Sequence, residues 1–367
     1  MKTILAAGHI CLDITPILEG HNAESITDVL VPGRLVQAGE AAIHLGGSVA
    51  NTGLAIKKLG GNVRLLGKVG PDQFGQMVKN LVEKEGGSGI ITDDGSSTSY
   101  TIVLAVPGLD RMFLHHPGAN DTFSAADIRQ ADVSDAVLFH FGYPPLMKRM
   151  YQDGGHELHE MLKMMHEQGI ATSLDLAAVD PVSPAGQVNW SDLLSLVLPE
   201  VDFFVPSFEE LCYMLDPEKW REISANPEAV LSLDLKREAL PLAEKALSLG
   251  CAAVLLKCGT AGMALVTADP VRIQKIGKAL GLNTTEWAEK HLLQGCFPAE
   301  TLKSATGAGD ASIAAFLVAV TCGRPPERAL QIAAAEGACA VTTYDALSGL
   351  LSLSQLEEKI DAGWIRK

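Results

Sequence analysis

The sequence has few aromatic residues and little positive charge. Aromatic side chains make up 5% of the 367 residues, and 29 lysines and arginines stand against 44 aspartates and glutamates, for a formal net charge of −15. No run of lysines and arginines forms a basic patch. Because binding to DNA or RNA needs a basic face that neutralises phosphates, this balance argues against a nucleic-acid partner. A single nucleotide needs only a local positive site and is not excluded.

Long apolar runs and paired cysteines are also missing. No window approaches the uninterrupted apolar length that crosses a membrane, and the apolar run before Gly8 is too short for a secretory signal peptide. The seven cysteines contain no C-x-x-C pair, and most of them fall in apolar segments. Buried free thiols in a reducing compartment are the expected outcome. We therefore expect a cytoplasmic protein with no membrane partner.

Two common nucleotide-binding motifs are absent. The stretch from Gly61 to Lys68 has one residue too many between its glycines for a Walker A loop, and Val69 stands where Ser or Thr is required. Residues 307–312 have Ser312 where a dinucleotide-binding fingerprint needs Gly or Ala, and no clear strand precedes them. The sequence therefore disfavours a P-loop enzyme and a Rossmann-type oxidoreductase.

What the sequence does contain is a regular alternation of short apolar runs with amphipathic stretches. This pattern is typical of βα units around a mostly parallel sheet. The length fits one large α/β domain with appendages or two modest domains, and a hydrophobic content of 47% fits a generous core. We expect a single domain over residues 1–367. Strands are expected at 4–10, 63–69, 136–141, 170–176, 201–205, 252–257 and 263–266. Helices are expected at 50–59, 74–85, 157–167, 208–215, 239–249, 326–342 and 353–362.

Two segments depart from this alternation. Residues 28–45 and 97–116 are predicted to form strands with no helix between them, the second as a hairpin that turns at 107–110. A small β-sheet that covers the mouth of the large domain would account for both. The stretches 216–236 and 277–303 are long for connections and lack a clear strand.

The clearest functional pattern is Thr306-Gly307-Ala308-Gly309-Asp310. It precedes the uncharged segment 311–320, which predicts a helix buried on every side. Glycines at the helix start allow close approach of a ligand, and the free N–H groups of the first turn favour an anion. Asp310 at the same tip suits a base that deprotonates a hydroxyl as a phosphoryl group arrives. A capped core helix with an aspartate in its first turn remains open as the alternative.

Two motifs near the N-terminus offer polar groups to a hydroxylated ligand. Asp13 follows the first predicted strand, at the edge of an α/β sheet where ligands bind, and its carboxylate can accept hydrogen bonds from two hydroxyls. Gly46 and Gly47 open the helix that carries Asn51, whose amide group both donates and accepts. An ordinary turn aspartate and an ordinary helix start are the alternatives.

Three histidines, His156, His159 and His166, fall on one predicted helix and raise the question of a metal site. No carboxylate or cysteine completes a recognisable ligand set around them. A solvated helix face is therefore the expected explanation.

Taken together, these motifs resemble the ribokinase-like (PfkB) family of carbohydrate and nucleoside kinases. Gly46-Gly47 with Asn51 is similar to the first motif of that family, and residues 306–310 are similar to the second. Residues 69–75 and 257–262 match two further patterns, in the same order along the chain. The resemblance implies a doubly wound, mostly parallel α/β sheet with helices on both faces, plus a small β-sheet lid.

The resemblance also implies a role for each motif residue. Asp310 would be the general base, and Glu210 would order magnesium near the phosphates. The acceptor hydroxyls would be held by Asp13, Gly46, Gly47, Asn51 and, from the lid, Arg111. The transferred phosphoryl group would be bound by the backbone of Gly307, Ala308 and Gly309. The nucleotide would lie along Lys257, Gly259, Gly262 and Thr306.

Several positions depart from the family pattern. Ser207 stands where the magnesium element has Asn, and Ser304-Ala305 replaces the Asp-Thr that commonly precedes the glycines. Ser48 replaces the Lys of ribose-specific members, which argues against a ribokinase in the strict sense. The segment 277–303 lies where the adenine pocket is shaped, so the choice among nucleoside triphosphates stays open.

We therefore expect an ATP-dependent, magnesium-requiring kinase that phosphorylates a hydroxymethyl group of a sugar or sugar-like polyol. Alternatives are a nucleoside kinase, for which Tyr100 and Phe113 are the few lid rings able to stack on a base, and a non-catalytic sugar-binding regulator. Retention of Asp310 beside the glycines argues against the regulator. A homodimer joined through the lid is expected, whereas the sugar, the carbon phosphorylated and activation by a monovalent cation are left open.

Overall fold

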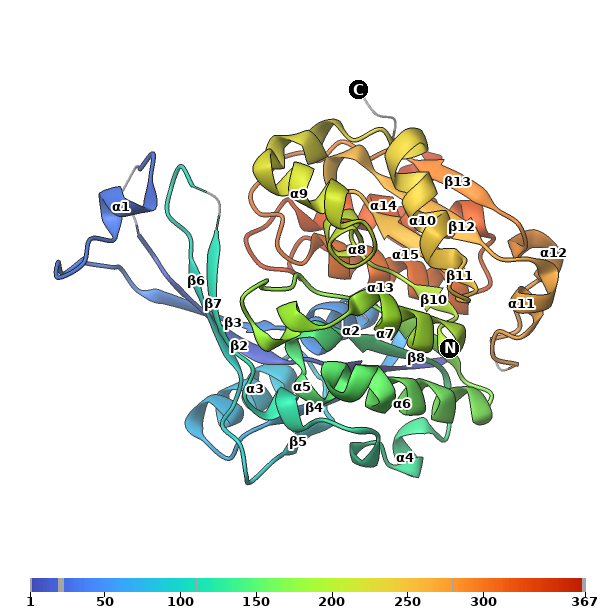
Figure 1. Ribbon diagram of the computed structural model, residues 1–367, viewed down its shortest axis with the longest axis horizontal. Coiled ribbons are helices and arrows are strands. Elements are labelled where there is room, and N and C mark those ends of the chain that lie inside the picture. Colours follow the sequence, from blue (N-terminus) through green and yellow to red (C-terminus); the bar gives the residue numbers. More distant parts are fainter. Residues whose placement is uncertain (1, 19–22, 110, 279, 365–367) are drawn as a thin grey trace.

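Two β-sheets frame the structure, a computed structural model that describes residues 2–18, 23–109, 111–278 and 280–364 (Figure 1). Within those residues the larger sheet has nine strands in the order β13-β12-β11-β10-β9-β8-β1-β4-β5. Neighbours from β5 to β11 are parallel, whereas β12 and β13 are antiparallel. The strands are β1 (Thr3–Gly8), β4 (Asn62–Val69), β5 (Ile90–Thr92), β8 (Ala136–Gly142), β9 (Ala171–Leu174), β10 (Phe203–Phe204), β11 (Ala253–Lys257), β12 (Met263–Thr267) and β13 (His291–Gln294).

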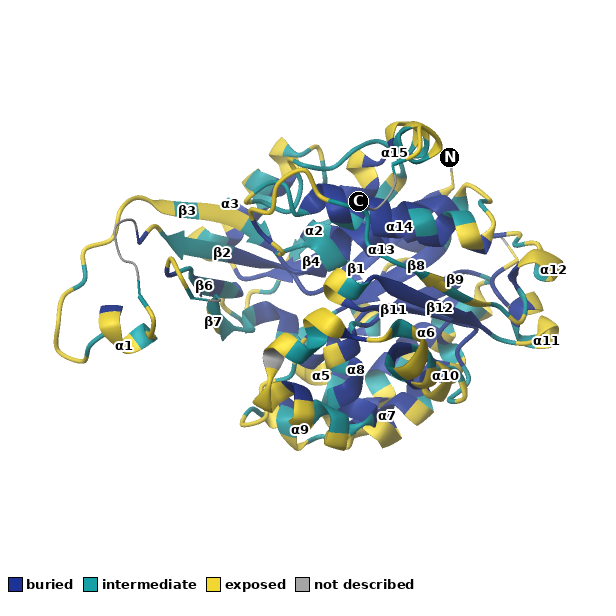
Figure 2. Ribbon diagram, turned by 90° about the horizontal axis from the view of Figure 1, so that it is seen from above, coloured by how far each residue is buried: buried dark blue, intermediate teal, exposed yellow. Residues whose placement is uncertain are grey.

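Helices cover both faces of the larger sheet (Figure 2). Ile4 packs into one hydrophobic cluster and its neighbour Leu5 into the other, because successive strand side chains point to opposite faces. One face carries α2 (Ser48–Lys58), α13 (Ala308–Thr321), α14 (Pro326–Ala340) and α15 (Leu353–Asp361). The other carries α5 (Lys148–Tyr151), α6 (His156–Glu167), α7 (Trp190–Val197), α8 (Phe208–Leu215), α9 (Pro217–Ala225) and α10 (Leu240–Leu247). The remaining helices are α1 (Ile26–Val29), α3 (Gln73–Lys84), α4 (Gln130–Val133), α11 (Pro270–Gln274) and α12 (Thr284–Trp287).

The helix α13 is buried as the uncharged segment predicts. Every residue from Asp310 to Val320 is buried, and the helix packs between α2 and α14. Since such a helix has no polar face to turn toward water, its direction is fixed by packing on both sides. Its N-terminus is thereby held at the carboxyl edge of the parallel strands.

The smaller sheet forms a lid that projects from the main body, at the left of Figure 1. Its strands run in the order β3-β2-β6-β7, with β2 and β6 parallel and the outer pairs antiparallel. The strands are β2 (Cys11–Pro16), β3 (Ala41–Gly46), β6 (Tyr100–Leu104) and β7 (Met112–His116). The predicted hairpin over 97–116 is therefore confirmed, although position 110 in its turn lies outside the described residues.

Two predictions about strands near the N-terminus are wrong. The segment 28–45 is not extended throughout, because α1 ends at Val29 and β3 begins only at Ala41. The prediction of one strand over 4–10 with Asp13 after it is also wrong, because β1 ends at Gly8 and a second strand, β2, starts at Cys11 and contains Asp13. This second strand belongs to the lid. Gly8 has a φ of 127°, and a Cβ there would overlap the backbone of Gly142. A glycine at this point lets the chain pass from one sheet to the other, and no apolar pattern signals that bend.

The two long connections contain regular structure that the sequence analysis missed. Residues 216–236 include α9, and residues 277–303 include α12 and the edge strand β13. β13 is only four residues long and pairs antiparallel with β12. So short a strand has no periodicity to detect.

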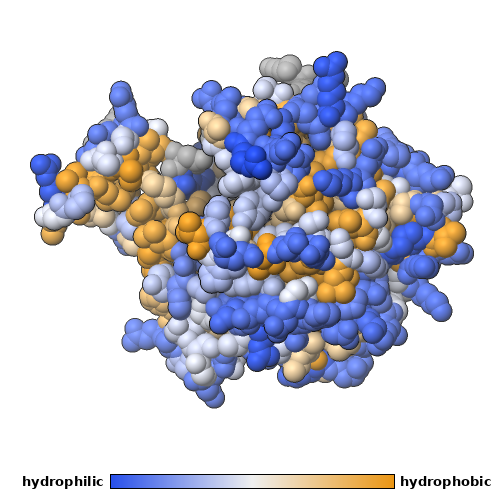
Figure 3. Space-filling view, in the orientation of Figure 1, coloured by the Kyte–Doolittle hydropathy of each residue, from blue (hydrophilic) through white to orange (hydrophobic). Residues whose placement is uncertain are grey.

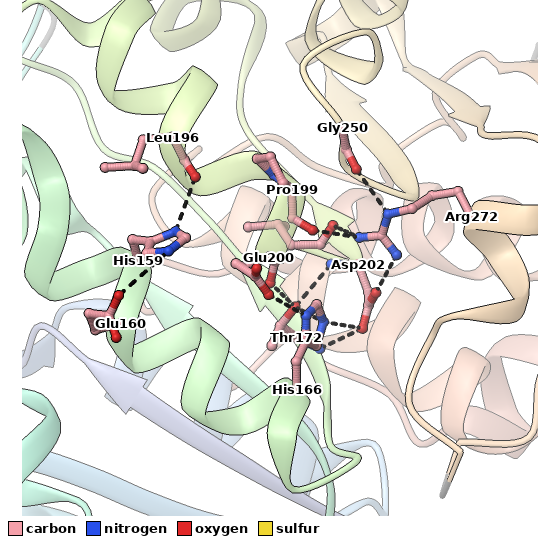
Figure 4. A network of polar contacts seen from close by, with 11 residues as sticks. His159, Glu160, His166, Thr172, Leu196, Pro199, Glu200, Asp202, Gly250 and Arg272 are labelled. Carbon is pink, nitrogen blue, oxygen red and sulfur yellow. Dashed lines mark hydrogen bonds and ion pairs between the residues drawn. The ribbon is translucent and has the colours of Figure 1, made fainter.

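A polar network lies at the amino ends of β9 and β10, the end of these strands that is away from the lid (Figure 4). His166 Nδ1 lies 2.8 Å from Glu200 Oε2, and its Nε2 lies 3.1 Å from Asp202 Oδ2. Arg272 Nη1 lies 2.9 Å from the other oxygen of Asp202. Burial favours the neutral imidazole, but the hydrogen bonds and charges of Asp202 and Glu200 outweigh it and raise the pKa of His166. The network thus ties α6 and α11 to the start of β10.

The same network decides the question of a histidine metal site. His156 is exposed as expected, but His159 and His166 are half-buried and have polar partners, so the solvated-face interpretation is wrong for these two. Among the described residues, no group of three histidine, cysteine, aspartate or glutamate side chains is placed to hold a metal. His159 and His166 are held by partners within the protein.

The structure also bears on membranes and on the cysteines. None of the described helices is both long enough and apolar enough to cross a bilayer. Five of the seven cysteines are buried: Cys11, Cys212, Cys251, Cys258 and Cys339.

Candidate active site

The N-terminus of α13 forms an outward-facing turn of backbone N–H groups. Gly307 adopts a left-handed conformation with φ 76°, and a side chain there would overlap Ala346. Only glycine fits both conditions. In the first turn of a helix the N–H groups have no acceptor within the helix, so those of Gly309 and Asp310 are free to bind an anion. The helix tip therefore presents N–H groups at the position where the anion site is predicted.

The Asp310 carboxylate is held by three side chains from two other elements. Asn51 Nδ2 donates to Oδ2 at 3.1 Å, and Thr52 Oγ1 donates to Oδ1 at 3.0 Å, both from α2. The Tyr143 hydroxyl donates to Oδ2 at 2.7 Å from the loop after β8. These bonds fix the direction of a carboxylate that is only 6% exposed. Asn51, expected on the acceptor, thus also touches the predicted base.

Tyr143 and Thr52 were not predicted as site residues. Burial and the nearby charge of Asp310 raise the pKa of Tyr143 well above its usual value, so the phenol remains a proton donor. Tyr143 is also one of the few described non-glycine residues with positive φ, at 69°, a conformation that costs energy and often marks a functional position. Its location directly after a strand that ends at the ligand edge was the available signal.

Lys257 brings a positive charge to the anion site. Its Nζ lies 2.8 Å from Asp175 Oδ1, and its side chain passes within van der Waals reach of a Cβ placed on Gly309. Burial favours the neutral amine, but the carboxylates of Asp175, Glu210 and Asp310 outweigh it and raise the pKa of Lys257. Lys257 ends β11 and Asp175 follows β9, so both stand at the carboxyl edge of the sheet. Asp175 was missed by the sequence analysis.

Glu210 lies in the first turn of the helix α8 and forms a capping box with Ser207. Ser207 Oγ accepts from Glu210 N at 3.3 Å, and Glu210 Oε2 accepts from Ser207 N at 2.8 Å, which is a capping box. Ser207, which departs from the family's Asn, thus serves as the helix cap. Among the described residues, Glu210 Oε1 makes no hydrogen bond or ion pair.

The residues near this site fit a magnesium ion bound mainly by phosphates. Mg²⁺ usually keeps several waters and takes one or two carboxylates together with phosphate oxygens. Glu210 and Asp175 are carboxylates close enough to Lys257 and to each other to interact electrostatically. A complete cage made by protein side chains is not required for this mode of binding.

Asp13 and the first glycine pair meet at the junction of lid and main sheet. Asp13 lies within β2, opposite His44 of β3, and a Cβ on Gly46 would overlap its carboxylate. A Cβ on Gly47 would lie 2.6 Å from His9 Nδ1. Burial raises the pKa of Asp13, and hydrogen bonds from Cys11 and Thr101 oppose that rise. Both glycines therefore leave room for polar groups at this junction.

Arg111 reaches from the lid to the loop before the anion site. Its guanidinium donates to Thr306 Oγ1, and Nη2 donates to Ser304 Oγ at 2.8 Å. Thr306 N in turn lies 3.2 Å from Ser304 Oγ. Arg111 was expected on the acceptor, and these contacts place its guanidinium at the loop that precedes α13.

The two glycines expected along the nucleotide differ in their surroundings. Gly259 begins a short turn between β11 and β12 and has open space around its Cα. Gly262 has a φ of 117° and would overlap the carbonyl of Gln294 if it carried a Cβ. Packing against β13 is thus sufficient to explain Gly262, whereas Gly259 is exposed.

Comparison with known proteins agrees with this geometry. The model of the pfkB family carbohydrate kinases matches residues 1–352. The chain belongs to this pfkB family. The pfkB match covers the lid, the Gly46-Gly47 pair with Asn51, residues 306–310 and α14. The sequence resemblance is thereby confirmed, and the family is one of carbohydrate kinases.

Curated relatives of this chain include plant fructokinases. It is 27% identical over 249 residues to probable fructokinase-4 of Arabidopsis thaliana, an alignment that covers 66% of this chain and 70% of that protein. It is 25% identical over 215 residues to fructokinase-2 of Oryza sativa subsp. japonica, with 58% and 59% covered. Across such relatives the aligned part ranges from 46% to 70% of the relative's own length.

Solved structures confirm the ribokinase-like fold of this pfkB chain. Fructokinase with bound ATP from Xylella fastidiosa has a TM-score of 0.70 at 21% identity, with 98% of both chains covered. Ribokinase of Arabidopsis thaliana, complexed with ribose and ATP, has a TM-score of 0.68 at 20% identity, with 97% and 98% covered. A putative ribokinase II from E. coli in complex with ATP and Mg²⁺ has a TM-score of 0.68 at 20% identity, with 99% and 100% covered.

Proposed function

We propose that this protein is an ATP-dependent, magnesium-requiring kinase that phosphorylates a hydroxymethyl group of a sugar or sugar-like polyol. One observation carries the proposal. The Asp310 carboxylate is directed by Asn51, Thr52 and Tyr143 at the same helix tip whose free N–H groups stand beside Lys257. A base and an anion site side by side are what transfer of a phosphoryl group to a hydroxyl requires.

In the proposed reaction Asp310 is the general base. The acceptor O–H proton passes to its carboxylate as the acceptor oxygen bonds to the γ-phosphorus of ATP. The bond from that phosphorus to the β–γ bridging oxygen breaks, and ADP leaves. The N–H groups of Gly309 and Asp310, with the ammonium of Lys257, stabilise the charge of the transferred group. Bound Mg²⁺ would neutralise phosphate charge, and Glu210 and Asp175 are the carboxylates we propose to hold it.

The acceptor is proposed to lie between Asp13 and Asp310. Asp13 would accept hydrogen bonds from its hydroxyls, with Gly46 and Gly47 leaving the room. The ring of Tyr100 packs against Phe74 and His116 on the face of the lid opposite His115, and so points away from the proposed acceptor site. Only one of the two predicted stacking rings is left, which supports a sugar over a nucleoside.

The remaining ring keeps the nucleoside kinase as the second candidate. Phe113 alternates with Leu114 along β7, lies on the same face as His115, and is 57% exposed. A purine or pyrimidine could stack on it. The sugar remains our first choice, because the curated relatives are fructokinases.

We further propose that the lid excludes water from the reaction and joins two copies of the chain. The contact of Arg111 with Thr306 supports closure over the phosphate side. Hydrophobic side chains gather over the lid, at the left of Figure 3, and those exposed include Ile43, Phe113 and Leu114. Sheet edges and exposed apolar side chains are commonly covered by a partner. The buried cysteines support a reducing, cytoplasmic location.

Release of ADP from ATP and Mg²⁺ across a panel of sugars, sugar acids, polyols and nucleosides tests the proposal. We expect turnover with at least one sugar or polyol, and repetition with and without potassium settles the question of a monovalent cation. Turnover with nucleosides alone would establish the second candidate. Acceptor binding with no turnover on any member would instead support a sugar-binding regulator. A monodisperse monomer at micromolar concentration would contradict the dimer.

A further inference from the structure

Two histidines connect the lid to the main sheet at the acceptor end of the site. His9 follows β1 and is buried, and its Nε2 lies 3.2 Å from the Nε2 of His115 on the lid strand β7. The two ring centroids are 5.0 Å apart. The second ring nitrogen of His115, Nδ1, lies 3.1 Å from Thr101 Oγ1 on the neighbouring strand β6. A polar bridge therefore runs from the core into the lid.

The bridge continues from Thr101 to Asp13. These two residues are register partners in the parallel pair β2 and β6, so their side chains lie on the same face of the lid sheet. Hydrogen bonding from Thr101 opposes the rise in the pKa of Asp13, and Thr101 Oγ1 also lies 3.6 Å from Cys11 Sγ. Cys11 Sγ donates to Asp13 Oδ1 at 3.2 Å. The only other charged or titratable group that interacts with this carboxylate among the described residues is His44 of β3. The ends of the bridge are thus His9 and Asp13.

Two continuous directions of hydrogen bonds connect His9 to Asp13 through this bridge, and the Thr101 hydroxyl has Cys11 Sγ, 3.6 Å away, as a further partner. In the first, His9 Nε2–H donates to His115 Nε2, His115 Nδ1–H donates to Thr101, and Thr101 O–H donates to Asp13. In the second, every donor is reversed, so Asp13 loses the Thr101 proton. His9 would then carry its proton on Nδ1, which has no partner among the described residues. Buried N–H donors without an acceptor are rarer than acceptors left unfilled, and a buried carboxylate needs its donors. The first direction is therefore favoured.

We propose that His9 and His115 are positioning residues that direct the Thr101 hydroxyl onto Asp13 when the lid is seated, and so couple acceptor binding to lid position. The inference rests on the proposed role of Asp13 in holding the acceptor. His115, Thr101 and Asp13 all move with the lid sheet, whereas His9 belongs to the core. When the lid lifts, His115 loses the donor that fixes its tautomer, and the Thr101 hydroxyl is free to turn away. Asp13 then presents a less well oriented carboxylate to the acceptor hydroxyls.

The tautomers provide a test that does not depend on activity. Heteronuclear NMR of nitrogen-labelled protein distinguishes the protonated from the bare nitrogen of each imidazole. We expect His9 to be protonated on Nε2 and His115 on Nδ1. The opposite tautomer at either histidine would overturn the proposal whatever the enzyme does.

Kinetics provide the second test, in the enzyme as isolated. Thr101→Val removes the hydroxyl with little change in shape, and His115→Phe removes both ring nitrogens. Each should raise KM for the acceptor by about tenfold, the effect of one lost hydrogen bond to a charged group, with kcat and KM for ATP changed by less than about threefold. His115→Asn places an amide donor where Nδ1 stands and should recover part of the loss. An unchanged acceptor KM in folded Thr101→Val protein would overturn the proposal.

Two further variants separate this proposal from the proposed function. His116→Phe removes a histidine from the opposite face of the same strand and should leave the acceptor KM unchanged. Asp13→Asn should raise the acceptor KM more than Thr101→Val does. If Asp13→Asn leaves it unchanged while the predicted tautomers are observed, the acceptor is held elsewhere. That outcome removes the coupling and the assignment of Asp13, but not the kinase activity.

Discussion

The Tyr143 hydroxyl donates a 2.7 Å hydrogen bond to Asp310 Oδ2, across 167 positions of the sequence. Tyr143 comes from the carboxyl end of β8 and Asp310 from the tip of α13, so the bond joins the sheet to the buried helix. The donor is a phenol whose pKa is raised by burial first and by the Asp310 charge second. The phenol therefore stays protonated, and it orients the Asp310 carboxylate by donating a hydrogen bond to it.

Tyr143→Phe tests this relationship. The ring and its packing remain, but the ionised form of Asp310 loses one of its three donors. Since a hydrogen bond to a charged group contributes about 1.5–3 kcal/mol, we expect kcat/KM to fall on the order of tenfold and the acid limb of its pH profile to move to higher pH. Steady-state kinetics over a pH series measures both. A profile that superimposes on that of the unaltered protein would assign the phenol a purely structural role.

Asp310→Asn tests the base itself. General-base assistance contributes about 10²–10⁴-fold, and an amide cannot take the proton, so turnover should fall by roughly that factor with acceptor and ATP affinities little changed. The fold should survive, because the hydroxyls of Thr52 and Tyr143 can donate or accept. Turnover is measured by ADP release and folding by thermal unfolding. Near-normal turnover in a well-folded variant would show that the carboxylate is structural.

Glu210→Gln tests the magnesium assignment. Glutamine can still accept from Ser207 N, so the cap of α8 is retained, while the negative charge is lost. The Mg²⁺ concentration for half-maximal turnover should rise several-fold, with little effect on acceptor KM. Titration of Mg²⁺ at fixed ATP measures it, with Glu209→Gln as the matched control on the same turn. Ser207→Asn keeps a capping residue and should leave activity unchanged or improved. An unaltered magnesium requirement in Glu210→Gln would remove that residue from the metal site.

His166→Gln tests the polar network at the amino ends of β9 and β10. The pKa of His166 is raised in the folded state by Asp202 and Glu200. Its contribution to stability is therefore full below about pH 6.5, the value of an unperturbed histidine, and is lost as the pH rises through the raised folded pKa. Urea unfolding over this range should show a free energy of unfolding that falls with pH.

The slope of that fall should be smaller in His166→Gln. The control is His156→Gln, because His156 is exposed on the same helix, and this variant should keep the slope of the unaltered protein. Equal slopes in all three proteins would mean that the imidazole of His166 does not gain its proton on folding.

Much of the fold was predictable because the periodicity of hydrophobic residues in a short segment specifies a helix or a strand. The uncharged run 311–320 could only be a buried helix, and the apolar runs along the parallel strands gave their positions to within a few residues. Prediction failed where a strand was too short to show a period, or where one apolar run contained the bend between two strands. β13 has four residues, and the passage from β1 to β2 lies inside one apolar run and depends on the conformation of Gly8.

The sequence by itself determined the elements of the site: a glycine-rich helix tip, an aspartate in its first turn, an acid and a glycine pair near the N-terminus, and a lysine at the end of a strand. Only the tertiary structure decided which side chains meet. Tyr143 on Asp310, Asp175 on Lys257 and His115 on His9 each join segments far apart in the chain. Local patterns specify which face of an element is apolar, but not which distant polar group it will face. That choice is made when strand order and helix packing bring the carboxyl ends of the strands together.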